Sequence, residues 1–419
     1  MATLFIRFQD RAIGFETFPS FILLSGAVFV GLLVNKPANF PTPLKQDKTL
    51  LWFYLIGGFS TFIAALLDSI SIMQTLGASM LVYYFSSRLV DTPNKFFILY
   101  AISIGIAAVL ASEAITSFKT DPVSPFRYGN DVEGYRLQGW ARYANANEFG
   151  AILIIPLAYS FSLIFGIKSW IIRGAILAAS AILVEGMLLT LSRTCMATLG
   201  IMAIVTLVLW FGGNIIKKAL IVGIASVICI GALSVVPGPV QDRFYSISDY
   251  ENDASFQGRQ RAWEQGWHMA KSHPIWGIGV LQWDRYHGRA SHNTFIQILA
   301  ETGFVGLGLF LMSIGYALYN GYQLLSDPRF QRGHPIRAIA VGTITALIGF
   351  LIYGFFGNQG YTPFVYMYIG LCTALIHLGK NSLSEPSANL AKKVNNGSRK
   401  KSFRRFHPGI RLPNRSQAQ

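Results

Sequence analysis

Residues 148–166 read EFGAILIIPLAYSFSLIFG, and after a gap of three positions residues 170–191 read WIIRGAILAASAILVEGMLLTL. Each run is long enough to cross the roughly 30 Å hydrocarbon layer of a bilayer as a helix, which takes about 20 apolar residues. Inside that layer the backbone must satisfy its own hydrogen bonds, so such runs are expected to be helical. The two runs predict a pair of membrane-spanning helices joined by a short connection.

Similar apolar runs recur along the whole chain. Apolar residues make up 52% of the 419 positions and charged residues 13%, against about 25% charged in soluble domains. This composition excludes a soluble enzyme and predicts an all-α polytopic membrane bundle of about 11–12 helices. The candidate spans are 18–34, 50–67, 69–90, 96–116, 148–166, 170–191, 194–211, 218–236, 294–320, 336–356 and 361–378.

The connections between these spans differ in charge, and that difference predicts their side of the membrane. Short connections rich in Lys and Arg are typical of the cytoplasmic side. They alternate with the connections that contain the two longest segments, 117–147 and 237–293, which should therefore be periplasmic. The N-terminus would then lie outside, unless residues 1–17 contain a further span. The basic connections are Lys36–Lys48, Arg88–Lys95, Lys168–Arg173, Lys217–Lys218 and Arg329–Arg337.

The formal net charge of +15 is concentrated at the C-terminal end. Ten of the 35 basic residues lie within residues 380–419, which lack apolar periodicity. We therefore expect a transmembrane domain over 1–379, including both periplasmic segments, followed by a disordered basic cytoplasmic tail over 380–419. Such a tail fits anionic membrane lipids as partners, and nucleic acid is not expected.

The second long outer segment has an unusual composition. It contains four of the eight tryptophans and four of the seven histidines. Arg259, Trp263, Trp267 and Lys271 are spaced by four, so they would share one face of a helix. One interpretation is an interfacial helix anchored by its indoles. The other is a lid over a sugar site, in which Trp263 contacts the substrate, and the two are compatible.

Arginines near the outer ends of predicted spans are candidate anion ligands. Arg193 lies in a connection of only a few residues, and Arg259 and Arg261 lie in the second outer segment. A guanidinium offers a fixed fork of donors that matches phosphate oxygens. The alternative for Arg193 is a side chain that extends to the interface without a ligand. Converging arginines on the outer side favour a pyrophosphate.

His292 is the candidate for proton transfer, because imidazole titrates near neutral pH. It lies beside Asn293, at the start of the span 294–320. The alternative is structural, since residues 291–294 (SHNT) are also typical of a helix cap. Ionisable residues inside apolar runs are expensive, so Glu301 should face a partner or a polar cavity, and Glu185 is expected to pair with Arg193.

Several chemistries lack their motifs in this sequence. There is no HExxH, no CxxC pair, no P-loop and no dinucleotide-binding fingerprint. The histidine pairs 268/273 and 287/292 have a spacing of five, which fits no favoured zinc pattern. We therefore expect no metal site and no cofactor.

Three motifs resemble motifs of the O-antigen ligase and polymerase superfamily, and they follow one another along the chain in the order that the family has. Residues 291–306, SHNTFIQILAETGFVG, look like its signature. Residues 190–193, TLSR, are similar to its Ser-Arg motif. Residues 258–263, GRQRAW, followed by 274–279, PIWGIG, resemble its Gly-Arg…Trp…Pro…Gly-x-Gly stretch. A looser likeness covers residues 139–147, which end in Asn145-Ala146-Asn147.

The resemblance implies a GT-C-like membrane glycosyltransferase of the bacterial inner membrane. Its donor would be a polyprenyl-pyrophosphate-linked glycan, and its acceptor a hydroxyl of lipid A core or of another glycan at the periplasmic face, without a metal. Carried over by position, Arg193 and Arg259 would hold the pyrophosphate. His292 would act at the reaction centre as base or as acceptor-orienting group, with Asn293 beside it. Arg261 has no counterpart in the family pattern.

Three alternatives to the ligase remain open at the level of sequence. One is a repeat-unit polymerase for O-antigen or exopolysaccharide, because the shared motifs do not separate it from a ligase. Another is a non-enzymatic assembly partner in envelope synthesis. The third is a bicarbonate or small-anion transporter, to which some members of the superfamily are assigned. A transporter should place polar groups on broken helices at mid-membrane, whereas the polar cluster predicted here lies at the outer interface.

Overall fold

The computed structural model describes residues 27–28, 30–31, 34, 44–66, 69–121, 123–128, 135–139, 145–234, 236, 238–245 and 254–380. Most of the predicted span 18–34 lies outside these residues, as do residues 1–17 and the tail after residue 380.

Helices make up most of the described structure, so the predicted all-α fold is confirmed. Ten of the eleven predicted spans coincide with a helix, with ends that differ by a few residues. Within the described residues, six helices are long and apolar enough to cross a membrane, namely α5, α6, α7, α8, α13 and α14. The chain is therefore a multi-pass membrane protein.

The long helices, in chain order, are α3 (Lys45–Ala64), α4 (Ser69–Leu89), α5 (Pro93–Thr120), α6 (Ala146–Gly166), α7 (Trp170–Leu189), α8 (Arg193–Phe211), α9 (Ile215–Leu233), α13 (Thr294–Ser326), α14 (Pro335–Gly354) and a last helix over 363–380.

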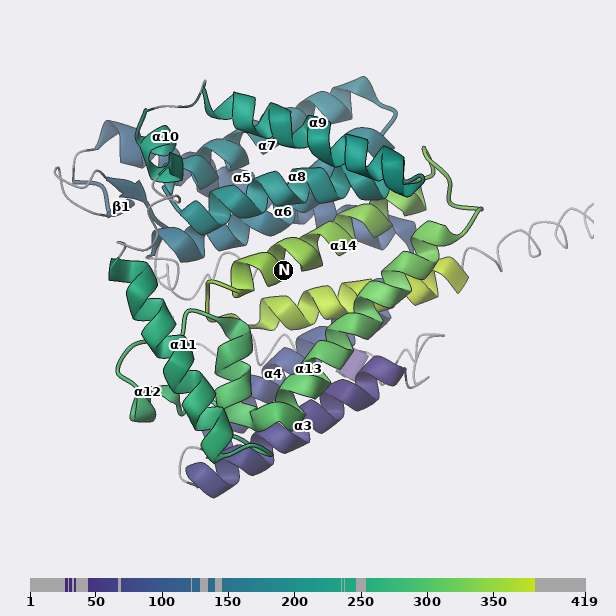
Figure 1. Cartoon of the computed structure of the whole chain (residues 1–419). Coiled ribbons are helices and arrows are strands. Elements are labelled where there is room, and N and C mark those ends of the chain that lie inside the picture. The colour runs from purple at the N-terminus through teal and green to yellow at the C-terminus, as the bar shows by residue number, and fades with distance from the viewer. Residues whose placement is uncertain are drawn as a thin grey trace, which may run out of the picture.

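The centre of the bundle is formed by α6 and α14, which pack against each other (Figure 1). About 78% of the apolar window of each is buried, against 28% for α7. A helix that is apolar on all sides is suited to burial in a core or to a membrane span, and both helices have this character. Tyr100 of α5 stacks on Tyr159 of α6 and donates its hydroxyl to the Ile339 carbonyl of α14 at 2.8 Å, which ties the three helices together.

One end of the bundle carries the short elements (Figure 1). A two-stranded antiparallel hairpin pairs β1 (Arg127–Tyr128) with β2 (Arg136–Leu137), with Arg127 opposite Leu137. The helices α10 (Gly238–Tyr245), α11 (Ala254–Ser272) and α12 (Trp283–Tyr286) lie at the same end. We call this the cavity end. Both long segments predicted to be periplasmic therefore meet here.

The opposite end carries the basic connections, and we call it the basic end. Arg88 is buried and pairs with Asp47 at the start of α3. Arg337 donates to the Leu209 carbonyl at 2.7 Å, which fixes the connection before α14 to the end of α8. The alternation predicted from charge thus corresponds to two distinct ends of the bundle.

Helix α13 is broken at Gly303, whose φ of 69° and ψ of −174° are not helical. Figure 1 shows its first part beside α11 and its longer part beside α3. Residues 274–283 pack into the break, where Ile278 and Gly279 donate to the carbonyls of Ala300 and Glu301. Backbone groups exposed by the break thereby find partners, as an apolar environment requires.

Candidate active site

A cavity of about 420 Å³ opens at the cavity end and is lined by four arginines. Two of them, Arg193 and Arg259, were predicted from the sequence, and the structure brings them together. Arg136 of β2 and Arg243 of α10 complete the set. The other lining residues are Asn147, Leu191, Ser192, Thr194, Ala197, Phe256 and Phe356, so no acidic side chain among the described residues lines the cavity.

Arg193 is placed by a tight turn between α7 and α8. Leu191 in that turn has a φ of 47°, a left-handed conformation that costs a non-glycine residue about 1–3 kcal/mol. Ser192 is the N-cap of α8 and accepts from the Cys195 amide at 3.4 Å. Arg193 therefore becomes the first residue of α8, at the helix end that faces the cavity.

The two arginines that sequence reasoning missed hold this turn in place. Arg136 donates from Nε to the Thr190 carbonyl at 2.8 Å, and Arg243 donates from Nε to the Leu191 carbonyl at 3.3 Å. They come from different outer segments, so both segments contribute to the position of Arg193. The available signal was their charge, because arginines in segments predicted to be periplasmic go against the usual bias.

Two helix N-termini add positive potential to the cavity. Helix α8 begins at Arg193, and α6 begins beside Asn147, whose amide donates to the Asn145 N-cap at 2.8 Å. Arg136 also donates to Asn147 Oδ1 at 3.0 Å, which links the arginine to the start of α6. Helix N-termini carry partial positive charge and bind anions readily. The cavity is thus suited to a ligand with several negative charges.

His292 lies next to the cavity, in the segment that enters α13. The φ of His292 is 45°, which is left-handed like that of Leu191. Hydrogen bonds hold the residues on either side of it, Ser291 and Asn293. Asn293 is the N-cap of α13 and accepts from the amides of Phe295 and Ile296. Asn358 Oδ1 accepts from the Ser291 hydroxyl at 2.7 Å and from the Asn293 amide at 3.2 Å.

The electrostatic environment favours the neutral form of His292. Burial lowers the pKa of its imidazole below the usual value, and the positive charges of Arg259 and Arg289 lower that pKa further. An imidazole that is neutral near pH 7 can accept a proton. His292 is not one of the residues that line the cavity. Arg259 connects the two, because its charge lowers the pKa of His292 and its side chain lines the cavity.

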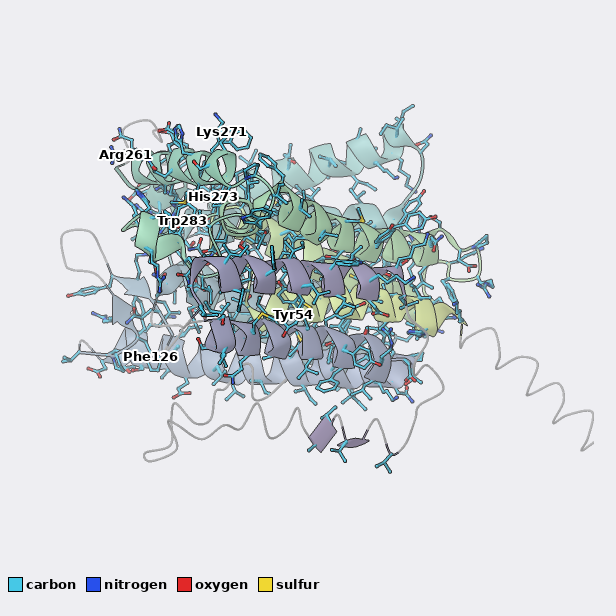
Figure 2. All side chains as sticks on the ribbon, turned by 90° about the horizontal axis from the view of Figure 1, so that it is seen from below. Tyr54, Phe126, Arg261, Lys271, His273 and Trp283 are labelled. Atoms are coloured by element: carbon cyan, nitrogen blue, oxygen red, sulfur yellow. The ribbon has the colours of Figure 1, made fainter. Side chains whose placement is uncertain are left out.

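The remaining predicted substrate ligands have different surroundings. Trp263 donates from Nε1 to the Ser291 carbonyl at 2.9 Å, and its ring packs on Phe355, so it supports the segment of His292 from α11. Asn293 uses its side-chain oxygen to cap α13. Arg261 is exposed and is not among the residues that line the cavity, and Figure 2 shows it at the periphery of the molecule.

Glu185 and Glu301 were both predicted to have a partner, and both have one in the structure. The partner of Glu185 is not the predicted one. The expected pair of Glu185 with Arg193 is wrong, because Glu185 of α7 forms an ion pair with Lys119 at the end of α5. Helix α5 packs against α7 and so brings Lys119, in its last turn, to Glu185, a contact that helix periodicity does not reveal.

Glu301 has a structural role as a buried carboxylate. It accepts from the amides of Leu281 and Trp283 at 3.1 and 3.2 Å and thereby holds residues 274–283 in the break of α13. The glycines of the PIWGIG motif make this approach possible, since Gly277 has a φ of 72° and a Cβ there would lie 2.4 Å from the Glu301 carbonyl carbon.

Metal ligands do not cluster in the described part of the chain. No group of three or more His, Cys, Asp or Glu side chains among those residues is placed to hold a metal ion.

The fold and the cavity define a polytopic helical membrane protein with a cationic site at one end. Residues 175–311, from α7 into α13, match a family model described as O-antigen ligase. The chain is also similar to the exopolysaccharide production protein ExoQ of Rhizobium meliloti (strain 1021), with 31% identity over 98 residues. That match covers 19% of this chain and 22% of ExoQ, so the chain spans about a fifth of the length of this relative.

A structural likeness accompanies these matches. One chain of a solved structure described as "Structural coordination of polymerization and crosslinking by a peptidoglycan synthase complex" has a TM-score of 0.46 and 14% identity, over 81% of this chain and 98% of that chain. At those values the likeness supports no conclusion about function. The family and sequence matches support a similarity to the O-antigen ligase and polymerase superfamily, as the three motifs predicted.

Proposed function

We propose that the protein is a membrane glycosyltransferase that moves a polyprenyl-pyrophosphate-linked glycan onto an acceptor hydroxyl. The observation that carries this proposal is the cavity of four arginines and two helix N-termini with a neutral histidine beside it. A diphosphate bridging a lipid and a sugar is a compact, multiply charged anion of the kind such a cavity would bind.

The reaction follows from this arrangement. The acceptor oxygen bonds to the anomeric carbon of the donor, and the bond from that carbon to the diphosphate oxygen breaks with its electron pair leaving on the diphosphate. His292 accepts the hydroxyl proton of the acceptor, and the single displacement inverts the anomeric centre. Charge that develops on the leaving diphosphate is stabilised by preorganised donors, chiefly Arg193 and Arg259. Because the arginines supply this stabilisation, we propose that no metal is needed.

The charge distribution supports an orientation in the bacterial inner membrane. The basic end carries Lys45, Lys48, Arg88 and Lys95, together with the arginines of residues 329–337. By the positive-inside bias this end faces the cytoplasm, and the C-terminal tail with it. The cavity end then faces the periplasm, where lipid-linked glycans would be the donors.

The acceptor defines which of two reactions the protein performs. We take ligation to lipid A core as the first candidate, because the matching family model is described as O-antigen ligase. Polymerisation of repeat units is the second candidate, since the similar ExoQ is named for exopolysaccharide production.

A small-anion transporter is less well supported. The broken helix that it would need is present in α13, but residues 274–283 fill the break. A Cβ on Gly303 would lie 2.6 Å from the backbone of Ile275, so the two backbones are already in contact.

The proposal is tested in a host that lacks its own ligase. Wild type, His292→Ala and Arg259→Gln are expressed together with Lys271→Gln, which removes an exposed cation from the same helix as Arg259. We expect wild type and Lys271→Gln to restore capped or extended surface glycan on gels. We expect His292→Ala and Arg259→Gln to lose it, since each removes a group from the reaction centre. Membrane insertion of every variant is checked on blots.

Equal glycan in all four strains would contradict the assigned site. Unchanged glycan with altered bicarbonate uptake would favour the transporter.

A further inference from the structure

Arg289 is a cation beside His292 that the motifs do not include. It lies in the short segment between α12 and α13, its side chain is exposed, and its charge acts on His292 together with that of Arg259. It does not line the arginine cavity. His292 therefore has one cationic neighbour that lines the cavity and a second that faces solvent.

The side chain of Arg289 occupies space that a glycine leaves free. A Cβ on Gly258, the residue before Arg259 in α11, would lie 1.8 Å from Nη1 and 2.4 Å from Cζ of Arg289. The guanidinium thus rests directly on the helix backbone. This contact gives a physical reason for glycine in the GRQRAW motif, because any other side chain at 258 would displace the guanidinium.

The backbone of Arg289 is fixed as well. The Trp283 indole donates from Nε1 to the Arg289 carbonyl at 2.8 Å, and Trp283 is itself buried with its amide held by Glu301. Two residues later, the Trp263 indole holds the Ser291 carbonyl. Indoles from α12 and α11 therefore fix the backbone at Arg289 and at Ser291, the residue before His292.

We propose that Arg289 binds an anionic group of the acceptor, so that the acceptor is a glycan bearing a carboxylate or a phosphate near its reacting hydroxyl. This inference rests on the proposed function, in which the arginine cavity holds the donor diphosphate. A guanidinium on the solvent side of the base is placed to orient the incoming sugar. Its forked donors match both carboxylate and phosphate.

The test measures binding to the full-length protein in nanodiscs. Farnesyl diphosphate is kept at saturation so that it occupies the donor cavity. Methyl glucoside, methyl glucuronide and glucose 6-phosphate are then titrated and followed by saturation-transfer NMR. We expect wild type to bind one or both anionic sugars about tenfold more tightly than the neutral one, as a charge-assisted hydrogen bond provides. The glucuronide and phosphate arms show which anion is preferred.

Variants separate the role of Arg289 from a general charge effect. Arg289→Gln should abolish the preference, Arg289→Lys should retain part of it, and the exposed Lys271→Gln should leave it unchanged. Gly258→Ala should abolish it too by moving the guanidinium, while the fold is retained because alanine is the better helix former. Farnesyl diphosphate should bind Arg289→Gln within about threefold of wild type, as for a partly solvated charge.

Three outcomes would overturn this inference. These are no preference in wild type, an undiminished preference in Arg289→Gln, or a loss of farnesyl diphosphate binding in Arg289→Gln as large as in Arg259→Gln. Failure of wild type to bind farnesyl diphosphate at all would instead count against the proposed function.

Discussion

His292 and Leu191 share a left-handed backbone conformation, with φ values of 45° and 47°. Each residue immediately precedes the N-cap of a helix that begins at the site, α13 for His292 and α8 for Leu191. Strained non-glycine residues persist only where their surroundings fix them, and they concentrate at functional sites. Here the surroundings are two arginines around Leu191 and an asparagine and an indole around His292.

The sequence predicted three residues of the candidate site, but not the contacts that position them. Arg193, Arg259 and His292 could be predicted because each lies in one of the ordered motifs, and Arg193 and His292 also lie at the ends of apolar runs. Arg136 could not, because its contact with Thr190 joins positions 54 residues apart. Arg289 was not singled out either, since its position depends on the space above Gly258.

The pH dependence of activity should reflect the environment of His292. Its pKa is lowered, so the neutral base persists as pH falls and is lost only below about 6.5, the usual value. We therefore expect the acid limb of kcat/KM to lie below pH 6.5. The position of the limb is measured by pH–rate profiles. Arg259→Gln, which should lose activity, removes a positive charge that lowers this pKa, so the pKa of His292 followed by NMR titration of its imidazole should rise toward 6.5 in that variant.

In Arg289→Gln the acid limb should move to higher pH for the same reason. An unchanged or lower pKa of His292 in Arg259→Gln would contradict the neighbourhood of Arg259 and His292.

At the scale of elements, the break in α13 is the feature that hydropathy could not reveal. The run 294–320 was predicted as one span, and the structure divides it at Gly303. The break depends on backbone contact with residues 274–283, which lie about 25 positions earlier in the chain, and periodicity does not report such contacts. The helix ends were predicted to within a few residues from the ends of the apolar runs. The capping residues, which mark each end more closely, could not be recognised from hydropathy.

Glycine at 277 should be essential to this junction. Its φ is 72°, and an added Cβ would meet the backbone of α13. We expect Gly277→Ala to lower the free energy of unfolding by roughly 2–4 kcal/mol. The measurement is thermal or denaturant unfolding in detergent.

The matched control is Gly288→Ala in the same outer segment, where a Cβ would meet nothing within 4 Å. It should change stability by less than about 0.5 kcal/mol. Equal stability of the two variants would show that the junction does not constrain residue 277.

At the scale of the whole molecule, charge divides the bundle into a cavity end and a basic end. The alternation of basic connections predicted this division, and the structure agrees with it because both long segments meet at the cavity end. The sequence could also predict a membrane bundle, since composition alone excludes a soluble chain. It could not predict that α6 and α14 form its centre, because most spans have similar hydropathy and only their packing distinguishes them.

Cysteine labelling tests the proposed orientation. His268 lies at the cavity end and Arg329 at the basic end, and both are exposed. Each is replaced by Cys in a Cys229→Ser background, since the other two cysteines are buried. A membrane-impermeant maleimide should label position 268 in cells with a permeabilised outer membrane, and position 329 only after the inner membrane is disrupted. The reverse pattern would place the cavity on the cytoplasmic side.

The most direct test of the central claim is the structure of the full chain in nanodiscs with a polyprenyl diphosphate, determined by cryo-electron microscopy. We predict density for the diphosphate between the guanidinium groups of Arg193 and Arg259, with the imidazole of His292 adjacent to it. Diphosphate density at the basic end, or in contact with neither arginine, would contradict the account.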